Sequence, residues 1–238
     1  MKKFFVLLAA FALGFAPSSF SAQQQQRPVF SVDAPAERIL NLDKLKTELK
    51  QYHDCACACG CYAKDLDAQA GKAIAFLRQR AAHRRSGEKL AMVLDIDETT
   101  LSNYEEMAKA DFAWDQKSFD DWVDSLNAPA IQPTLRLYNE AQRLGVSVFF
   151  ITGRPETQRD STERNLRAQG FQNWRQLTLR PVAHPEQSAS VYKSAARART
   201  VAQGYSLVLN VGDQWSDLKG KPEAEFSVKY PDPFYYLP

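Results

Sequence analysis

The chain has 238 residues, of which 45% are hydrophobic and 24% are charged, and its formal net charge is +2 at pH 7. A chain of this length can bury a sizeable hydrophobic core in one domain. Its near-neutral charge argues against general binding to nucleic acid or to a membrane surface, so we expect neither among its partners.

Residues 1–22 have the pattern of a cleaved secretory signal peptide. Two lysines supply positive charge, an uncharged apolar run covers residues 4–16, and small residues follow at positions 19, 21 and 22. The run is too short to span a membrane, and neither a second apolar run nor a nearby cysteine indicates an anchor. We therefore expect an exported protein, periplasmic or secreted, with residues 23–238 as a single domain.

Residues 34–86 have helical hydrophobic periodicity in two pieces, which predicts two amphipathic helices. Their junction holds every cysteine of the chain: Cys55, Cys57, Cys59 and Cys61. In an exported protein an even number of cysteines usually forms disulfides, and in a helical segment the pairs nearest to bonding distance would be Cys55 with Cys59 and Cys57 with Cys61. Local disulfides or inert thiols are favoured over a soft-metal site with His53, because zinc ligands usually come from two separated segments.

Two aspartates, Asp95 and Asp97, stand directly after the short apolar run of residues 90–94. Such a run suits a strand buried on both faces of a parallel sheet, and ligands bind beyond the carboxyl ends of such strands. One carboxylate can attack a phosphoryl group, the second can transfer protons, and the two together suit Mg²⁺. The alternative interpretation is an acidic helix N-terminus that Asp97 or Thr99 caps.

A segment rich in aromatic and acidic side chains, residues 101–132, follows the two aspartates. Because it is inserted directly after the first strand, we expect it to form a small helical cover over the crevice. Its aromatic side chains form either the core of this cover or a stacking surface for an aryl or nucleoside group. Pro133 then starts the next predicted helix, residues 134–144.

The second predicted strand, residues 146–151, ends at Thr152 and Gly153. A threonine hydroxyl and free backbone N–H groups at this point can hold a phosphoryl oxygen, and glycine lets the backbone approach an anion closely. A helix at residues 156–169 and a short strand at residues 176–179 follow.

Lys193 is expected at the head of a helix over residues 194–203, where the helix dipole disfavours a cation unless it neutralises an anion. The alternative is a solvated surface lysine. The strand of residues 207–211 leads to Asp213 and Asp217. Asp213 can complete a Mg²⁺ site, and Asp217 can bind the ion through a water molecule or support its direct ligands. A last strand is predicted at residues 225–229.

The order of these motifs resembles that of the haloacid dehalogenase (HAD) superfamily, in which Asp-x-Asp, Ser or Thr, Lys and Gly-Asp-x-x-x-Asp follow one another. Their surroundings resemble the subfamily IIIB acid phosphatases, a branch with class B/C-like bacterial enzymes and plant vegetative storage proteins. The matching stretches are Asp95-Ile-Asp-Glu-Thr, the following Leu-Ser-Asn, Ile151-Thr-Gly-Arg, Tyr192-Lys-Ser and Gly212-Asp-Gln-Trp-Ser-Asp. The resemblance runs from about Lys44 to the C-terminus. It implies a Rossmann-like α/β core of the HAD type, a mainly parallel sheet flanked by helices, with a small helical cap at residues 101–132 and an N-terminal helical extension.

The resemblance also implies roles for individual residues. Asp95 would be the nucleophile that forms an aspartyl-phosphate, and Asp97 the acid that protonates the leaving alcohol and later activates water. Thr152, Gly153 and Lys193 would bind the phosphoryl oxygens. Because Asp97 must begin protonated in this scheme, we expect the rate to fall as the pH rises above mildly acidic values.

The metal implied by the resemblance is Mg²⁺. Its ligands would be the carboxylates of Asp95 and Asp213 and the carbonyl of Asp97, with Asp217 behind them. A cation is needed because an anionic nucleophile must approach an anionic phosphate.

The sequence therefore predicts an exported, Mg²⁺-dependent acid phosphatase acting on small phosphomonoesters, with nucleotides and aryl phosphates among the candidates. The alternative is a storage or binding protein with little turnover on the same fold. A response-regulator receiver is disfavoured, because its phosphorylated aspartate follows the acidic pair on a later strand. The sequence leaves open the natural substrate, the preferred metal and the oligomeric state, for which a homodimer is one candidate.

Overall fold

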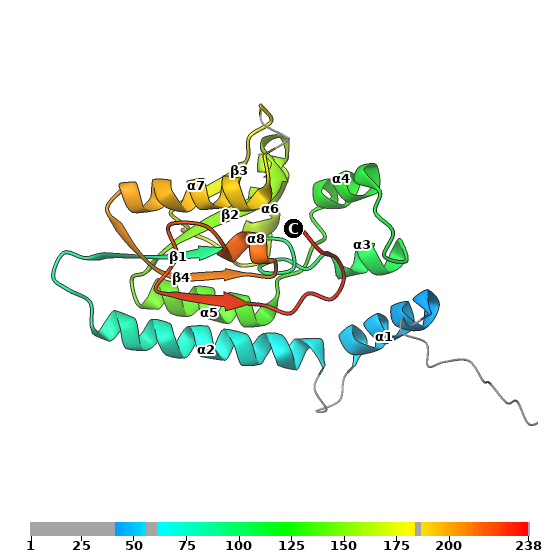
Figure 1. Cartoon of the computed structure of the whole chain (residues 1–238), viewed down its shortest axis with the longest axis horizontal. Helices are drawn as coiled ribbons and strands as arrows, with labels where there is room; N and C mark the ends of the chain where they lie inside the picture. Colours follow the sequence, from blue (N-terminus) through cyan, green and yellow to red (C-terminus); the bar gives the residue numbers. More distant parts are fainter. Residues whose placement is uncertain (1–40, 56–60, 184–186, 238) are drawn as a thin grey trace, which may run out of the picture. The chain divides into compact units, whose positions relative to one another are not determined.

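A computed structural model describes residues 41–55, 61–183 and 187–237, and from residue 41 onward these form one compact unit (Figure 1). The predicted signal peptide lies outside the described residues, as do Cys57 and Cys59. Among the helices that are described, none is long and apolar enough to cross a membrane.

A parallel sheet with the strand order β3-β2-β1-β4-β5 forms the centre of this unit (Figure 1). Its strands are β1 (Lys89–Leu94), β2 (Ser147–Pro155), β3 (Gln176–Arg180), β4 (Tyr205–Gly212) and β5 (Phe226–Lys229). The five predicted strands are thus present, and all neighbours pair in parallel, which confirms the α/β fold. Strand order reverses beside β1, where β2 and β3 lie on one side and β4 and β5 on the other. Such a switch point is where open α/β sheets bind ligands.

Helices cover both faces of the sheet, which explains why the central strand is apolar from Leu90 to Leu94 after the exposed Lys89. Leu90, Met92 and Leu94 of β1 join the core cluster that includes α2 (Tyr62–Ala82) and α5 (Gln132–Arg143). Ala91 and Val93, which alternate with them, join a second cluster under α7 (Ala189–Ala202). Side chains of a strand point alternately to its two faces, so each face of β1 needs apolar residues.

The remaining connections differ in detail from the predicted ones. Strand β2 continues to Pro155, so Thr152 lies in its last part, where the pairing with β3 shifts register. The predicted helix of residues 156–169 begins as a 3-10 turn, η1 (Glu156–Gln158), before α6 (Arg159–Ala168). A four-residue helix, α8 (Trp215–Leu218), follows β4.

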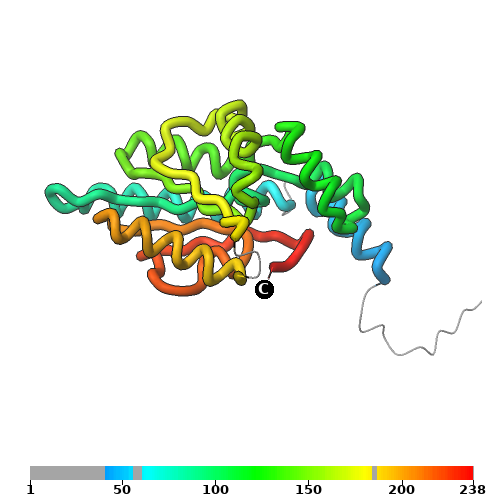
Figure 2. Tube along the Cα trace, turned by 90° about the horizontal axis from the view of Figure 1, so that it is seen from above, coloured from blue at the N-terminus to red at the C-terminus, as the bar shows by residue number. Residues whose placement is uncertain are grey.

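The segment of residues 101–132 contains two short helices, α3 (Tyr104–Lys109) and α4 (Gln116–Ser125). In Figures 1 and 2 they lie beyond the carboxyl ends of β1 and β4. Tyr104 and Trp122 are buried, and the Trp122 indole N–H donates to Asn103 Oδ1 at 3.0 Å. Both side chains join the core cluster that includes residues of α2 and α5, so these two aromatic side chains offer no exposed stacking surface.

A disulfide joins Cys55 to Cys61, with the two Cα atoms 5.7 Å apart. The predicted pairing of Cys55 with Cys59, and of Cys57 with Cys61, is therefore wrong. The prediction assumed a helical segment, whereas α1 (Leu42–Asp54) ends before Cys55 and α2 begins after Cys61. Both bonded residues have extended backbone, so helical spacing does not decide which cysteines meet.

Candidate active site

Three buried carboxylates meet at the carboxyl ends of β1 and β4. Asp95 follows β1 directly, and Asp213 and Asp217 follow β4. Each offers an oxygen, and these oxygens all lie within 4.8 Å of one another. Because β1 and β4 are paired in parallel as neighbours, their ends deliver the three side chains to the same edge of the sheet.

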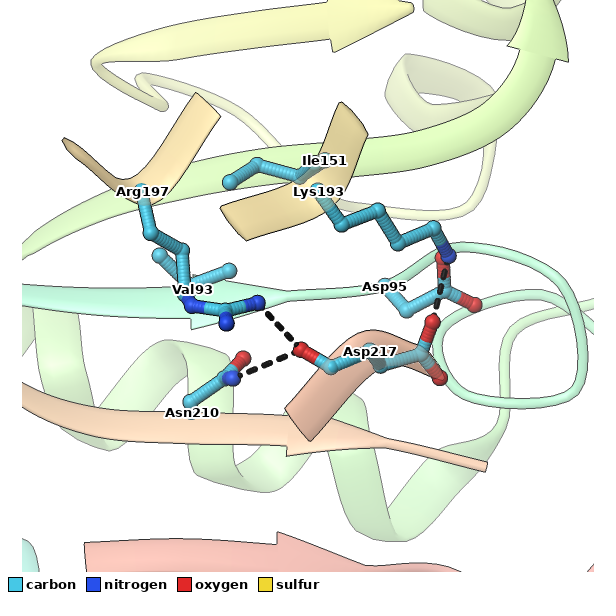
Figure 3. A pocket seen from close by; sticks show the side chains of 7 residues that line it. All are labelled: Val93, Asp95, Ile151, Lys193, Arg197, Asn210 and Asp217. Atoms are coloured by element: carbon cyan, nitrogen blue, oxygen red, sulfur yellow. Dashed lines mark hydrogen bonds and ion pairs between the residues drawn. The ribbon is translucent and has the colours of Figure 1, made fainter. Parts of the chain in front are cut away.

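Lys193 lies between two of these carboxylates (Figure 3). Its Nζ donates to Asp95 Oδ1 at 2.6 Å and also to Asp217 Oδ1. Burial alone would lower the pKa of Lys193, but the carboxylates of Asp217 and Asp95 raise it above its ordinary value, so the side chain stays charged.

The predicted position of Lys193 at the head of its helix is wrong. Helix α7 begins at Ala189, which places Lys193 in the second turn. The helix dipole acts mainly within the first turn, so it does not strongly disfavour a cation at Lys193. Lys193 lies on the face of α7 that packs towards the sheet, beside the buried Tyr192 and Ala196.

With its carboxylates ionised, this cluster carries more negative than positive charge. Three carboxylates face one ammonium group, which leaves two negative charges in a buried site. Burial raises the pKa of Asp95 and of Asp213, and the neighbouring Asp217 carboxylate raises both further. One divalent cation would balance the two charges, and a set of oxygen donors is the kind that Mg²⁺ prefers. The residues present therefore fit a divalent metal.

The side chain of Asp97 binds Arg154. Its Oδ1 accepts from Arg154 Nε at 2.9 Å, from Arg154 Nη2 at 2.7 Å and from Asn103 Nδ2 at 2.9 Å. Burial raises the pKa of Asp97, but the charge and hydrogen bonds of Arg154 and the amide of Asn103 outweigh it, so the pKa lies below its ordinary value. The expectation that Asp97 begins protonated is therefore wrong for the site without substrate.

Thr152 and Gly153 lie beside Asp97. The Thr152 hydroxyl is fully buried, accepts from the Arg154 N–H at 3.1 Å and donates to Asp97 Oδ2 at 3.4 Å. Gly153 is exposed, and a Cβ added there would meet no atom within 4 Å. The backbone at Gly153 is thus open to a ligand.

The alternative that Asp97 or Thr99 caps a helix is wrong. After Asp97 the chain turns through Glu98, whose φ is 55°, and the next helix begins only at Tyr104. Thr99 instead donates from its hydroxyl to Asp213 Oδ1 at 2.8 Å.

Several residues that contact the predicted site were not singled out from the sequence. Asp213 Oδ2 accepts from Gln214 Nε2 at 2.9 Å and from the Tyr235 hydroxyl at 3.3 Å. Gly212 makes room for Asp217, because an added Cβ would lie 2.3 Å from the Asp217 Cβ. Gln214 and Gly212 stand inside a recognised motif, which was a usable signal. Nothing in the sequence near Tyr235 points to Asp213.

The fold and the strand-end carboxylates define a Rossmann-like α/β protein of the HAD type. The family model described as HAD superfamily, subfamily IIIB (acid phosphatase), matches residues 18–238. The chain belongs to this family, as its motifs predicted.

Similar proteins include both enzymes and storage proteins. Acid phosphatase 1 of Solanum lycopersicum is 41% identical over 148 residues, which cover 61% of this chain and 58% of that protein. Vegetative storage protein 1 of Arabidopsis thaliana is 34% identical over 151 residues, which cover 61% of this chain and 55% of that protein. The chain thus spans less than two thirds of either relative.

The fold is similar to that of the class C acid phosphatase from Bacillus anthracis. The TM-score is 0.67 at 21% sequence identity, and the likeness covers 83% of this chain and 87% of that chain. At this identity the comparison bears on the fold alone.

Proposed function

We propose that the protein is a Mg²⁺-dependent acid phosphatase that hydrolyses small phosphate monoesters through a phosphorylated Asp95. The observation that carries the proposal is the meeting of Asp95, Asp213 and Asp217 around the Lys193 ammonium group, in a chain of the acid phosphatase family. Nucleotides and aryl phosphates are among the candidate substrates.

Asp95 is the proposed nucleophile. Lys193 holds its Oδ1, which leaves Oδ2 to attack the phosphorus atom. A bond forms between Oδ2 and phosphorus while the bond from phosphorus to the leaving oxygen breaks. The Gly153 N–H binds a non-bridging oxygen, and the Thr152 hydroxyl binds another when its proton turns from Asp97 Oδ2. The Lys193 charge moderates the repulsion between carboxylate and phosphate.

The carboxylates of Asp95, Asp213 and Asp217, with the Asp97 carbonyl, would hold Mg²⁺. When bound, the ion would supply charge that offsets the repulsion between the anionic nucleophile and the anionic phosphate.

Asp97 is the proposed acid and base. Arg154 keeps Asp97 ionised in the free site, so Asp97 must take up a proton when the substrate binds. A phosphate bound beside Asp97 adds negative charge and competes for Arg154, and both effects raise the pKa of Asp97. Protonated Asp97 then gives its proton to the leaving oxygen. In the second step it takes a proton from the water that attacks phosphorus and releases Asp95.

Export is part of the proposal. The charged, apolar and small-residue pattern of residues 1–22 supports a signal peptide. The Cys55–Cys61 disulfide supports it independently, because disulfides persist mainly in oxidising compartments. Mass spectrometry of the mature N-terminus from the exported fraction tests this, and a retained Met1 in that fraction would contradict it.

The proposal is tested by hydrolysis of an aryl phosphate with Mg²⁺ and with EDTA, comparing wild type with Asp95→Asn. We expect hydrolysis only by the wild type with Mg²⁺. Asp160→Asn is a matched control, because the Asp160 side chain is 81% exposed on α6, and it is expected to retain the wild-type rate. Equal rates in all samples would remove the phosphatase proposal. They would favour the alternative of a storage or binding protein, which the similarity to a vegetative storage protein supports.

A further inference from the structure

Arg197 has the largest fully buried side chain among the described residues. It follows Lys193 by four residues on α7, so both side chains leave the same face of the helix. Helix α7 therefore carries two buried cations, and only Lys193 has a role in the proposed reaction.

The Arg197 guanidinium binds main-chain carbonyls of one segment, residues 217–222. Its Nη1 donates to the Asp217 carbonyl at 2.6 Å, its Nε to the Pro222 carbonyl at 3.0 Å, and its Nη2 to the Gly220 carbonyl at 2.7 Å and to that of Lys219. The planar fork of arginine can satisfy several acceptors at once, which a lysine cannot.

The Asp217 carbonyl has a second donor. Asn210 Nδ2, from β4, donates to it at 2.9 Å, and Figure 3 shows both donors converging on this oxygen. The side chain of Asp217 is held separately, by Lys193 and by the Gln214 N–H at 2.8 Å. Both the backbone and the carboxylate of Asp217 are therefore fixed, and Arg197 and Asn210 together fix the backbone.

Burial of a guanidinium is costly, and an apolar side chain of similar volume would often stabilise a fold as well or better. The hydrogen bonds of Arg197 are charge-assisted, which makes them strong and directional. One of them falls on the carbonyl of Asp217, whose carboxylate contacts Lys193 and lies near those of Asp95 and Asp213, and the others hold the segment that follows Asp217. This arrangement suits the precise placement of a charged group better than it suits general stability.

We propose that Arg197 is a positioning residue that holds Asp217 in the carboxylate cluster and thereby sets the affinity of the cluster for a divalent cation. The inference rests on the metal site of the proposed function. It assigns Arg197 no contact with substrate or metal.

The test is direct binding of Mn²⁺, followed by electron paramagnetic resonance, to full-length wild type, Arg197→Lys and Arg197→Met. The Lys variant keeps the charge but loses the fork, and the Met variant loses both. We expect the dissociation constant for Mn²⁺ to rise at least about tenfold in the Met variant, as the loss of a charge-assisted hydrogen bond would produce, and less in the Lys variant. Arg199→Met is the matched control, because Arg199 is exposed on the same helix, and its Mn²⁺ affinity should match the wild type.

Thermal unfolding without metal separates positioning from general stability. Variants of Arg197 that unfold at lower temperature but bind Mn²⁺ within twofold of wild type would overturn the inference. If neither Arg197 variant folds, Asn210→Ala decides, because it removes the other donor to the same carbonyl. We then expect several-fold weaker Mn²⁺ binding, and unchanged binding would overturn the inference. Wild type that binds no Mn²⁺ would refute the metal site itself, and with it this inference.

Discussion

Replacement of Gly212 by alanine is expected to displace Asp217 and to reduce phosphatase activity strongly. An added Cβ would lie 2.3 Å from the Asp217 Cβ and 2.4 Å from its Oδ2. Carbon atoms in ordinary contact are about 3.5 Å apart, so the Asp217 side chain must move by roughly 1 Å. A displacement of about 1 Å in a positioned group can lower the rate about a hundredfold, which corresponds to about 2.7 kcal/mol of transition-state stabilisation.

The assay compares kcat/KM for an aryl phosphate at saturating Mg²⁺, with the dissociation constant for Mn²⁺ as a second measurement. Gly71→Ala is the matched control, because a Cβ added at Gly71 in α2 would meet no atom within 4 Å. That variant should keep the wild-type kcat/KM and gain roughly 0.5–1 kcal/mol of stability. Wild-type kcat/KM and Mn²⁺ affinity in Gly212→Ala would refute the reasoning.

Two further predictions concern ion pairs. Arg154→Met removes the charge that lowers the pKa of Asp97, so we expect that pKa to rise. The alkaline limb of the pH–rate profile should then move to higher pH. We also expect kcat to fall about tenfold, because Asp97 loses the partner that orients it. A limb at its wild-type position would contradict this. Hydrogen bonds from Arg80 and from the Arg85 N–H lower the pKa of Glu88 to about 2. A lowered pKa in the folded state stabilises the protein above the ordinary pKa of 4.5 and loses that effect as the pH falls towards 2. Glu88→Gln should therefore lose less thermal stability than wild type between pH 5 and pH 2.5, and an equal loss would count against the pairing.

The fold was predictable because its signals are local. The three central strands contain short, mainly apolar runs at residues 90–94, 146–151 and 207–211, and segments with helical patterns separate these runs. The meeting of Asp95 with Asp213 was also predictable, because parallel strands bring their carboxyl ends to one edge of the sheet. The class of the protein therefore followed from the order of its motifs.

What the sequence did not predict depends on contacts between distant segments. The partner of Asp97 is Arg154. Arg154 stands in a recognised motif, but it lies on β2, whereas Asp97 follows β1. Tyr235 reaches Asp213 from the C-terminal segment, whose composition gives no sign of it. The start of α7 was predicted too late, at residue 194 instead of Ala189, so Lys193 was placed before the helix although it lies in the second turn.

The central claim is that Asp95 carries the phosphoryl group during turnover. The most direct measurement is borohydride trapping of the wild type during hydrolysis of an aryl phosphate, since borohydride reduces an acyl phosphate to an alcohol. Mass spectrometry of the digested protein should then find homoserine at position 95, only when substrate and Mg²⁺ are present. Trapping at another carboxylate, or none during active turnover, would contradict the account.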